Sequence, residues 1–140
     1  MRVRNFILAD AVGGEGIYFL HGAGLERIQA HQFPHIHPTI GVLVTLVLEP
    51  GDKATESQLT IALVQEDGVA VDVLMQGKLA LPEIPEDPDQ GVSVINLVAQ
   101  KIGLTVPRGG RHWVTLEVGE MELDRTALAV GALAPEQPVG

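Results

Sequence analysis

The chain contains no cysteine and few basic or aromatic residues, and each shortage excludes a class of function. Without cysteine there is no disulfide, no thiolate metal ligand and no cysteine nucleophile. The 9 Lys and Arg residues stand against 18 Asp and Glu residues, which gives a net charge of −9. Nucleic acids and anionic membranes are bound by neutralising phosphate with Lys and Arg, so we expect neither as a partner. Aromatic residues make up only 4 %, too few for the stacking platforms of a typical sugar-binding surface.

Long apolar runs are also missing. The longest, residues 40–48, has the length of a strand, whereas a membrane helix needs about 20 apolar residues. Arg2 and Arg4 precede a short apolar run that stops at Asp10, before the ~7–15 residues of a signal-peptide core are reached. We therefore expect a soluble, cytoplasmic protein. There is no Gly-x-Ser-x-Gly motif, so serine hydrolysis is unsupported.

Apolar residues make up 46 % of the 140 residues and fall in short runs, rich in Val, Ile and Thr, that end at Gly, Pro or Asp-Gly. Such runs are typical of β-strands. A chain of this length suits one domain, and we expect it over residues 1–133, followed by a flexible tail over residues 134–140. The predicted fold is all-β: an antiparallel β-sandwich, Ig-like or of a similar Greek-key type, with about eight or nine short strands.

Two hairpins are predicted within this fold. In the first, residues 3–12 and a strand from residue 17 flank the Gly-rich loop 13–16. In the second, residues 57–66 and 69–81 flank Asp67-Gly68, a pair that favours a tight turn because Gly tolerates positive φ. The remaining expected strands are 39–49, 92–99, 104–106, 112–118 and 125–130.

Histidines are the one residue type with metal-ligand spacing. His35 and His37 form a His-x-His pair, which places two imidazoles on one face of an extended segment. His112 follows a Pro-x-Gly turn later in the chain. Together the two motifs resemble those of cupins, small β-barrels that often depend on a metal. His31 or Glu49 is the expected source of a further ligand.

The departures from that pattern leave a second interpretation open. Cupins carry a glutamate soon after the second histidine, and none is present here before Glu49. Pro34 and Pro38 bracket the histidine pair and favour a polar connecting loop without metal. The acidic segment 83–89 offers oxygen ligands for Ca²⁺ but lacks the spacing of a known calcium loop, so we expect a solvated charge run. The single Tyr18 and the single Trp113 are expected to anchor the core.

The chain resembles DUF6941, a family of short bacterial proteins of uncharacterised function. Phe6-Ile7-Leu8-Ala9-Asp10-Ala11, the Gly-rich hairpin after it, Leu20-His21-Gly22-Ala23-Gly24 and Arg27-Ile28 carry the resemblance. The Asp67-Gly68 hairpin, Gly110-Arg111-His112-Trp113 and a last strand ending at Val130 fit it as well. The resemblance implies a compact, Ig-like β-sandwich without an assigned reaction, and it supplies no catalytic residues.

Two functions therefore remain open. The first is a non-enzymatic module, without a cofactor, that acts through a protein partner or as a homo-oligomer. Residues 39–48 support it, because their odd-numbered and even-numbered positions are both apolar and both faces of this strand therefore need to be covered. The alternative is a cupin-like barrel in which His35, His37 and His112 hold a divalent transition metal and bind or act on a small polar metabolite.

Overall fold

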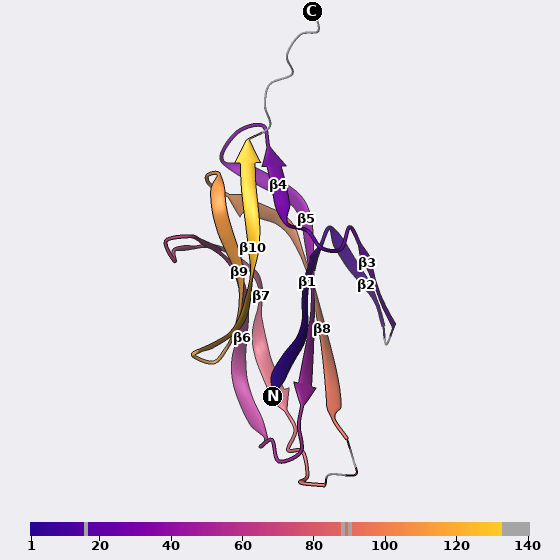
Figure 1. Ribbon diagram of the computed structural model, residues 1–140. Coiled ribbons are helices and arrows are strands. Elements are labelled where there is room, and N and C mark those ends of the chain that lie inside the picture. The colour runs from indigo at the N-terminus through magenta and orange to yellow at the C-terminus, as the bar shows by residue number, and fades with distance from the viewer. Residues whose placement is uncertain (16, 88, 90, 133–140) are drawn as a thin grey trace, which may run out of the picture.

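The computed structural model describes residues 1–15, 17–87, 89 and 91–132, and all regular structure in this part of the chain is β-strand (Figure 1). The strands are β1 (Arg2–Ala9), β2 (Ala11–Glu15), β3 (Ile17–His21), β4 (Arg27–Ala30), β5 (His35–Leu48), β6 (Thr55–Gln65), β7 (Ala70–Leu81), β8 (Ser93–Val106), β9 (Gly110–Val118) and β10 (Met121–Ala132). The all-β prediction is confirmed. The predicted flexible tail lies outside the described residues. Among the described residues there is no helix long and apolar enough to cross a membrane.

Three sheets make up the molecule. Strands β1–β5–β8 form a three-stranded sheet, β4–β10–β9–β6–β7 form a five-stranded sheet, and β2 and β3 form a separate ribbon. The two larger sheets form two layers (Figure 1), and side chains of both enter one apolar core. Neighbouring strands are antiparallel, except that β4 runs parallel to β10 at the edge of the five-stranded sheet. The expectation of a purely antiparallel fold is wrong at this edge, where β4 arrives through a loop rather than a hairpin.

The alternation of buried and exposed side chains along the strands shows where the core lies. On β5 the even-numbered apolar residues from Ile40 to Leu48 are buried, and they face Leu59, Ile61 and Leu63 of β6 within the same cluster. Each fully buried side chain of this kind contributes roughly 1.5–3 kcal/mol by leaving water. Trp113 does not anchor this core. It lies next to buried Val114 and points to the outer face of β9, half-buried, with the Arg125 guanidinium 5.2 Å from its ring centroid.

The first predicted hairpin is displaced. The expected strand 3–12 is interrupted at Asp10, and β2 begins at Ala11 and runs through Gly13 and Gly14 of the expected loop to Glu15. Gly13 pairs with Phe19 of β3, and the Phe19 ring packs over the space that a Gly13 side chain would fill. Glycine in β2 therefore makes room for an aromatic side chain on the neighbouring strand.

The strand pieces 92–99 and 104–106 are one strand, β8, paired along its whole length with β5. The register runs from His37–Leu104 to Thr39–Ile102, so Pro38 lies opposite Gly103. Pro38 has no N–H for the ladder, and Gly103 adopts a φ of 75°. At this point the face of β8 that points into the core changes. Leu104 is buried, whereas Ile102, two residues earlier, is 79 % exposed. The glycine thus twists the strand and turns its other face inward.

Candidate functional site

His35 and His37 lie in β5, not in a connecting loop, so the loop interpretation is wrong. Because Pro38 opposes Gly103, the ladder continues past it and takes in both histidines, which pair with Val106 and Leu104. Both side chains are half-buried, and their ring centroids are 5.9 Å apart. The His-x-His spacing therefore does place the two imidazoles on one face, as the sequence predicts.

His112 lies in β9, in the other large sheet, and is 1 % exposed. Its Nδ1 lies 3.0 Å from the carbonyl oxygen of Gly110, which fixes the ring when Nδ1–H donates to that oxygen. Its Nε2 is buried without a hydrogen-bond partner within the described residues, and the same holds for Nε2 of His35. In a metal-ligating histidine, one ring nitrogen usually donates to a fixed acceptor and the other nitrogen holds the metal.

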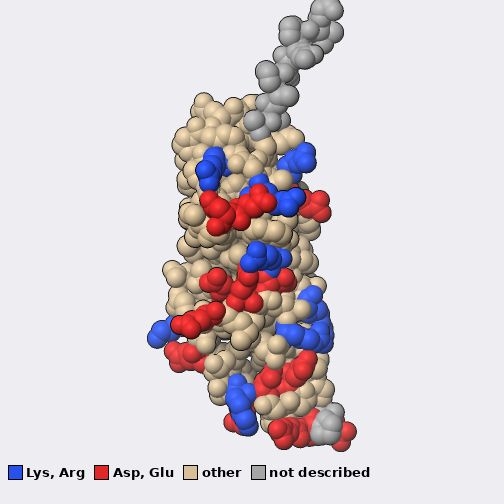
Figure 2. Space-filling model, turned by 60° about the vertical axis from the view of Figure 1, so that its left-hand side comes forward, with Lys and Arg blue, Asp and Glu red and all other residues tan. Residues whose placement is uncertain are grey.

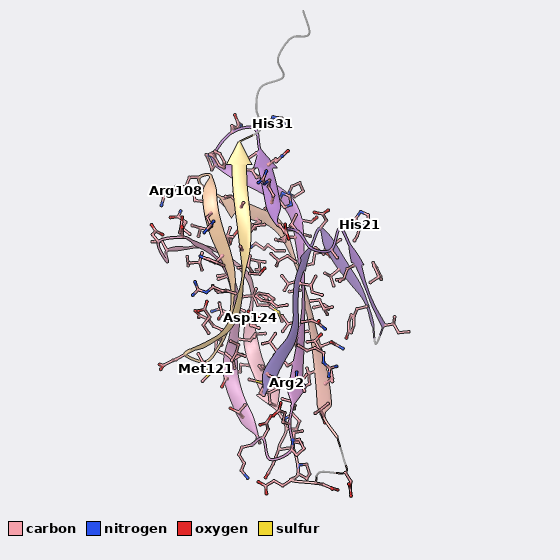
Figure 3. The ribbon with its side chains drawn as sticks, in the orientation of Figure 1. Arg2, His21, His31, Arg108, Met121 and Asp124 are labelled. Carbon is pink, nitrogen blue, oxygen red and sulfur yellow. The ribbon has the colours of Figure 1, made fainter. Side chains whose placement is uncertain are left out.

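The structure does not group the three histidines into a metal centre. Across residues 1–15, 17–87, 89 and 91–132, no three His, Asp or Glu side chains are arranged to hold a metal ion. Glu49 as a further ligand is wrong: it follows the far end of β5, roughly 45 Å along a 14-residue strand from His35, and pairs with Arg2 at 3.0 Å. His31 is exposed at the end of the molecule where β10 finishes (Figure 3). A metal site on His35, His37 and His112 stays a prediction.

The surroundings of His37 favour its neutral ring. Burial lowers the pKa of His37, the charge of the neighbouring His35 lowers it further, and the Asp10 carboxylate raises it in part. Asp10 itself is half-buried, and its carboxylate occupies the space that a side chain at Gly22 would need. His37 can therefore accept a hydrogen bond or offer a lone pair at neutral pH.

Sequence reasoning missed an exposed apolar feature, the β2–β3 ribbon. It projects from the side of the three-stranded sheet (Figure 1), and Ile17 and Phe19 on one of its faces are 88 % and 64 % exposed. Its other face meets the sheet where Val12 packs on Gly41 of β5. The unbroken run Ile17-Tyr18-Phe19-Leu20 was a signal, because a strand that is apolar on both faces needs cover on both faces.

Beneath the ribbon, the outer face of the three-stranded sheet carries uncharged cross-strand rows. One row is Ile7, Leu43 and Val98, all half-buried. In the next row Asn5 donates to Thr45 Oγ1 at 3.3 Å, and the Thr45 hydroxyl donates to Asn96 Oδ1 at 2.7 Å. The opposite side of the molecule differs: Figure 2 shows acidic and basic side chains spread over the five-stranded sheet. We call the exposed ribbon face and these two rows the ribbon surface.

The comparisons with solved structures concern the fold of the chain and not an activity. A structure of the DNA glycosylase AlkC of Pseudomonas fluorescens, bound to DNA with an abasic-site analogue, is similar with a TM-score of 0.53 and 12 % identity over 94 % of this chain and 30 % of that chain. A β-glucosidase from Listeria innocua in complex with glucose gives a TM-score of 0.49 and 13 % identity over 91 % of this chain and 16 % of that chain.

At these identities the likeness concerns the fold alone, and the chain spans less than a third of either enzyme. No curated protein matches the sequence at a significant level. A family of unknown function, DUF6941, matches residues 4–131, which is nearly the whole chain. The chain therefore belongs to the DUF6941 family.

Proposed function

We propose that the chain is a β-sandwich module of Ig-like or similar Greek-key type that acts by contact, through association of its ribbon surface with a second copy of the chain. The observation that carries this proposal is the exposure of Ile17 and Phe19 on a ribbon that leaves the body of the molecule. A two-stranded ribbon is only marginally stable in water, so leaving two large apolar side chains exposed on it calls for a partner surface.

A second copy supplies a partner surface of matching chemistry. A stable interface buries about 800 Å² on each partner, more than two side chains provide, so the sheet rows beneath the ribbon must contribute. In a two-fold dimer each ribbon would lie on the other copy's outer sheet face, and both halves of that contact are present on one side of the chain. The rows are uncharged, so this contact buries no charged side chain of the rows, and the acidic and basic side chains of the five-stranded sheet stay in solvent (Figure 2).

Sedimentation velocity on the full chain tests the proposal. The wild-type sedimentation coefficient is expected to rise with concentration in the micromolar range, and an Ile17→Ser/Phe19→Ser variant is expected to remain monomeric. Val69→Ser/Met121→Ser is the matched control, because these side chains are 56 % and 64 % exposed at the tips of other hairpins. A wild-type protein that stays monomeric at every concentration would contradict the proposal, as would equal effects of the two double variants.

A second candidate is a metal-binding protein that takes a small polar metabolite through His35, His37 and His112. The unpartnered, buried Nε2 atoms of His35 and His112 favour it. Elemental analysis of protein purified without a histidine tag tests it, beside a His35→Ala/His37→Ala variant. Near-stoichiometric Zn, Mn, Fe or Ni that the variant loses would support the metal site. A metal content far below stoichiometric in the wild type, even after incubation with added metal, would contradict the metal site.

A further inference from the structure

The structure assigns a phosphate-binding site to Arg27 and Arg111 on the outer face of the five-stranded sheet. The two arginines belong to one cross-strand row. Arg27 of β4 pairs with Ala129 of β10, and Ala129 pairs on its other side with Arg111 of β9. Residues that pair across strands share a face of the sheet, so both arginine side chains rise from the same face on either side of a methyl group.

The charge of this row is not balanced within the chain. Six of the nine Lys and Arg residues form ion pairs with carboxylates: Arg2, Lys53, Lys78, Lys101, Arg108 and Arg125. Within the described residues the other three, Arg4, Arg27 and Arg111, have no carboxylate within 4.0 Å. Two of these three stand in one row, in a protein with twice as many acids as bases. The two like charges stand on either side of Ala129 and repel each other, and an anion bound between them would remove that repulsion.

The surface around the row is hollowed on both sides. A hollow of about 360 Å³ adjoins the row at Gln29, Gly110 and Gly131, and another of about 470 Å³ adjoins it at Thr126 and Ala127. Arg27, Ala129 and Arg111 line both. The floor between the guanidinium groups is thus built from Ala129 and Gly131, which leaves room for a group that sits between them. Gln29 is exposed beside them and offers an amide donor.

Three acidic side chains line hollows that the arginines of the row also line. Glu26 lines the larger hollow but forms no ion pair with either arginine within the described residues. Glu66 and Asp67 line a further hollow that Arg111 also lines, and there Asp67 is paired with Arg108 at 3.4 Å. Within the described residues neither guanidinium of the row is therefore neutralised by a direct ion pair, although the whole molecule is acidic.

Two guanidinium groups and an amide over a small-residue floor match a tetrahedral dianion. Each guanidinium can donate two parallel hydrogen bonds to phosphate oxygens, and such charge-assisted pairs are the strong ones. The backbones of β4 and β9 lie about 10 Å apart, two strand spacings, so the long side chains can converge on one group from both sides. A phosphate monoester, carried by a metabolite or by a phosphorylated side chain, is the ligand class that fits.

Amide chemical shifts followed by NMR during titration with inorganic phosphate test the site, with sodium chloride at equal ionic strength as the reference. Saturable shifts are expected at Ala129, Gly131 and Gln29. In Arg27→Gln/Arg111→Gln the apparent Kd is expected to weaken by at least about tenfold, because bidentate charge-assisted contacts are lost. The matched control is Arg4→Gln/Lys53→Gln, which removes the same charge far from the row and is expected to keep the wild-type Kd.

Titrations with phosphoserine and with glucose 6-phosphate identify the source of the group, and tighter binding of either than of inorganic phosphate supports the site. Shifts that do not saturate with any of the three ligands overturn the proposal. Saturable shifts that persist in Arg27→Gln/Arg111→Gln overturn it as well. The site and the ribbon surface lie on different sheets, so each of the two proposals can fail without the other.

Discussion

Asp72 of β7 joins the two large sheets at one edge by accepting a hydrogen bond from the backbone N–H of Thr105 on β8, with 2.9 Å between Oδ2 and N. Lys101 Nζ lies 3.7 Å from the same carboxylate, which is half-buried. β7 and β8 are the last strands of their sheets, so this side chain takes the place of a ladder bond between two edges that do not pair. It also satisfies an edge N–H, which otherwise offers a site for unwanted strand pairing.

Removing this link is expected to lower stability. Asp72→Ala should reduce the free energy of unfolding by about 1–2 kcal/mol, because it leaves the Thr105 N–H without its charged acceptor. Asp72→Asn keeps an acceptor and should lose less. Glu56→Ala is the control, since Glu56 forms only an exposed pair with Lys78 at 3.5 Å and should change stability by less than about 0.5 kcal/mol. Urea unfolding measures all three, and an Asp72→Ala protein as stable as the control would refute the role of the link.

Gly103→Ala tests the twist that turns the end of β8 inward. A side chain at residue 103 would meet only ordinary contact with Ile36, 3.7 Å away, so the cost comes from the φ of 75°. This conformation disfavours L residues by about 1–2 kcal/mol, and we expect a loss of that size. Gly77→Ala, in β7 and with nothing within 4 Å, should be close to neutral. Thermal unfolding compares the two variants, and equal midpoints would contradict the strained conformation of Gly103.

Gly41→Ala tests the seat of the ribbon on the sheet. A methyl group there would come within 2.9 Å of the Val12 backbone nitrogen, and that backbone would have to move. We expect a loss of about 1–3 kcal/mol, the usual cost of overpacking, together with faster proteolytic cleavage in β2 and β3. Wild-type cleavage rates and sites in Gly41→Ala would mean that the ribbon does not depend on this contact.

Acidification is expected to destabilise the protein through His37. Burial holds the pKa of His37 below its ordinary value in the folded state, whereas the unfolded chain keeps a pKa of about 6.5. Below that pH the unfolded state binds more protons, so stability is greatest above it and falls as the pH drops toward the folded-state pKa. Thermal melts from about pH 7.5 to pH 5 stay above the range of most carboxylates and record this window.

In His37→Gln the dependence in this window should flatten, and in His31→Gln, which alters an exposed histidine at the end of the molecule, it should persist (Figure 3). A slope that His37→Gln leaves unchanged would assign the effect to other groups.

Period-two patterning and turn chemistry were enough to predict β6, β7 and the Asp67-Gly68 turn, because those signals are local. The ends of β5 and β8 were not predictable in this way. Pro38 and Gly103 each read as a strand end when considered alone, and only their opposition across the ladder lets both strands continue. For the same reason the sequence left a connecting loop open as one interpretation of His35 and His37. The row of Arg27 and Arg111 could not be predicted at all, since it depends on β4 pairing parallel to β10.

The central claim, association through the ribbon surface, is tested most directly by a distance between two copies. The chain contains no cysteine, so His21→Cys, at the base of the ribbon (Figure 3), introduces a single position for a spin label. Pulsed electron paramagnetic resonance at micromolar concentration is expected to give a discrete distance between labels that disappears when Ile17→Ser/Phe19→Ser is added. The account would be contradicted if no distance between the labels of two copies is detected, or if the combined variant gives the same distance.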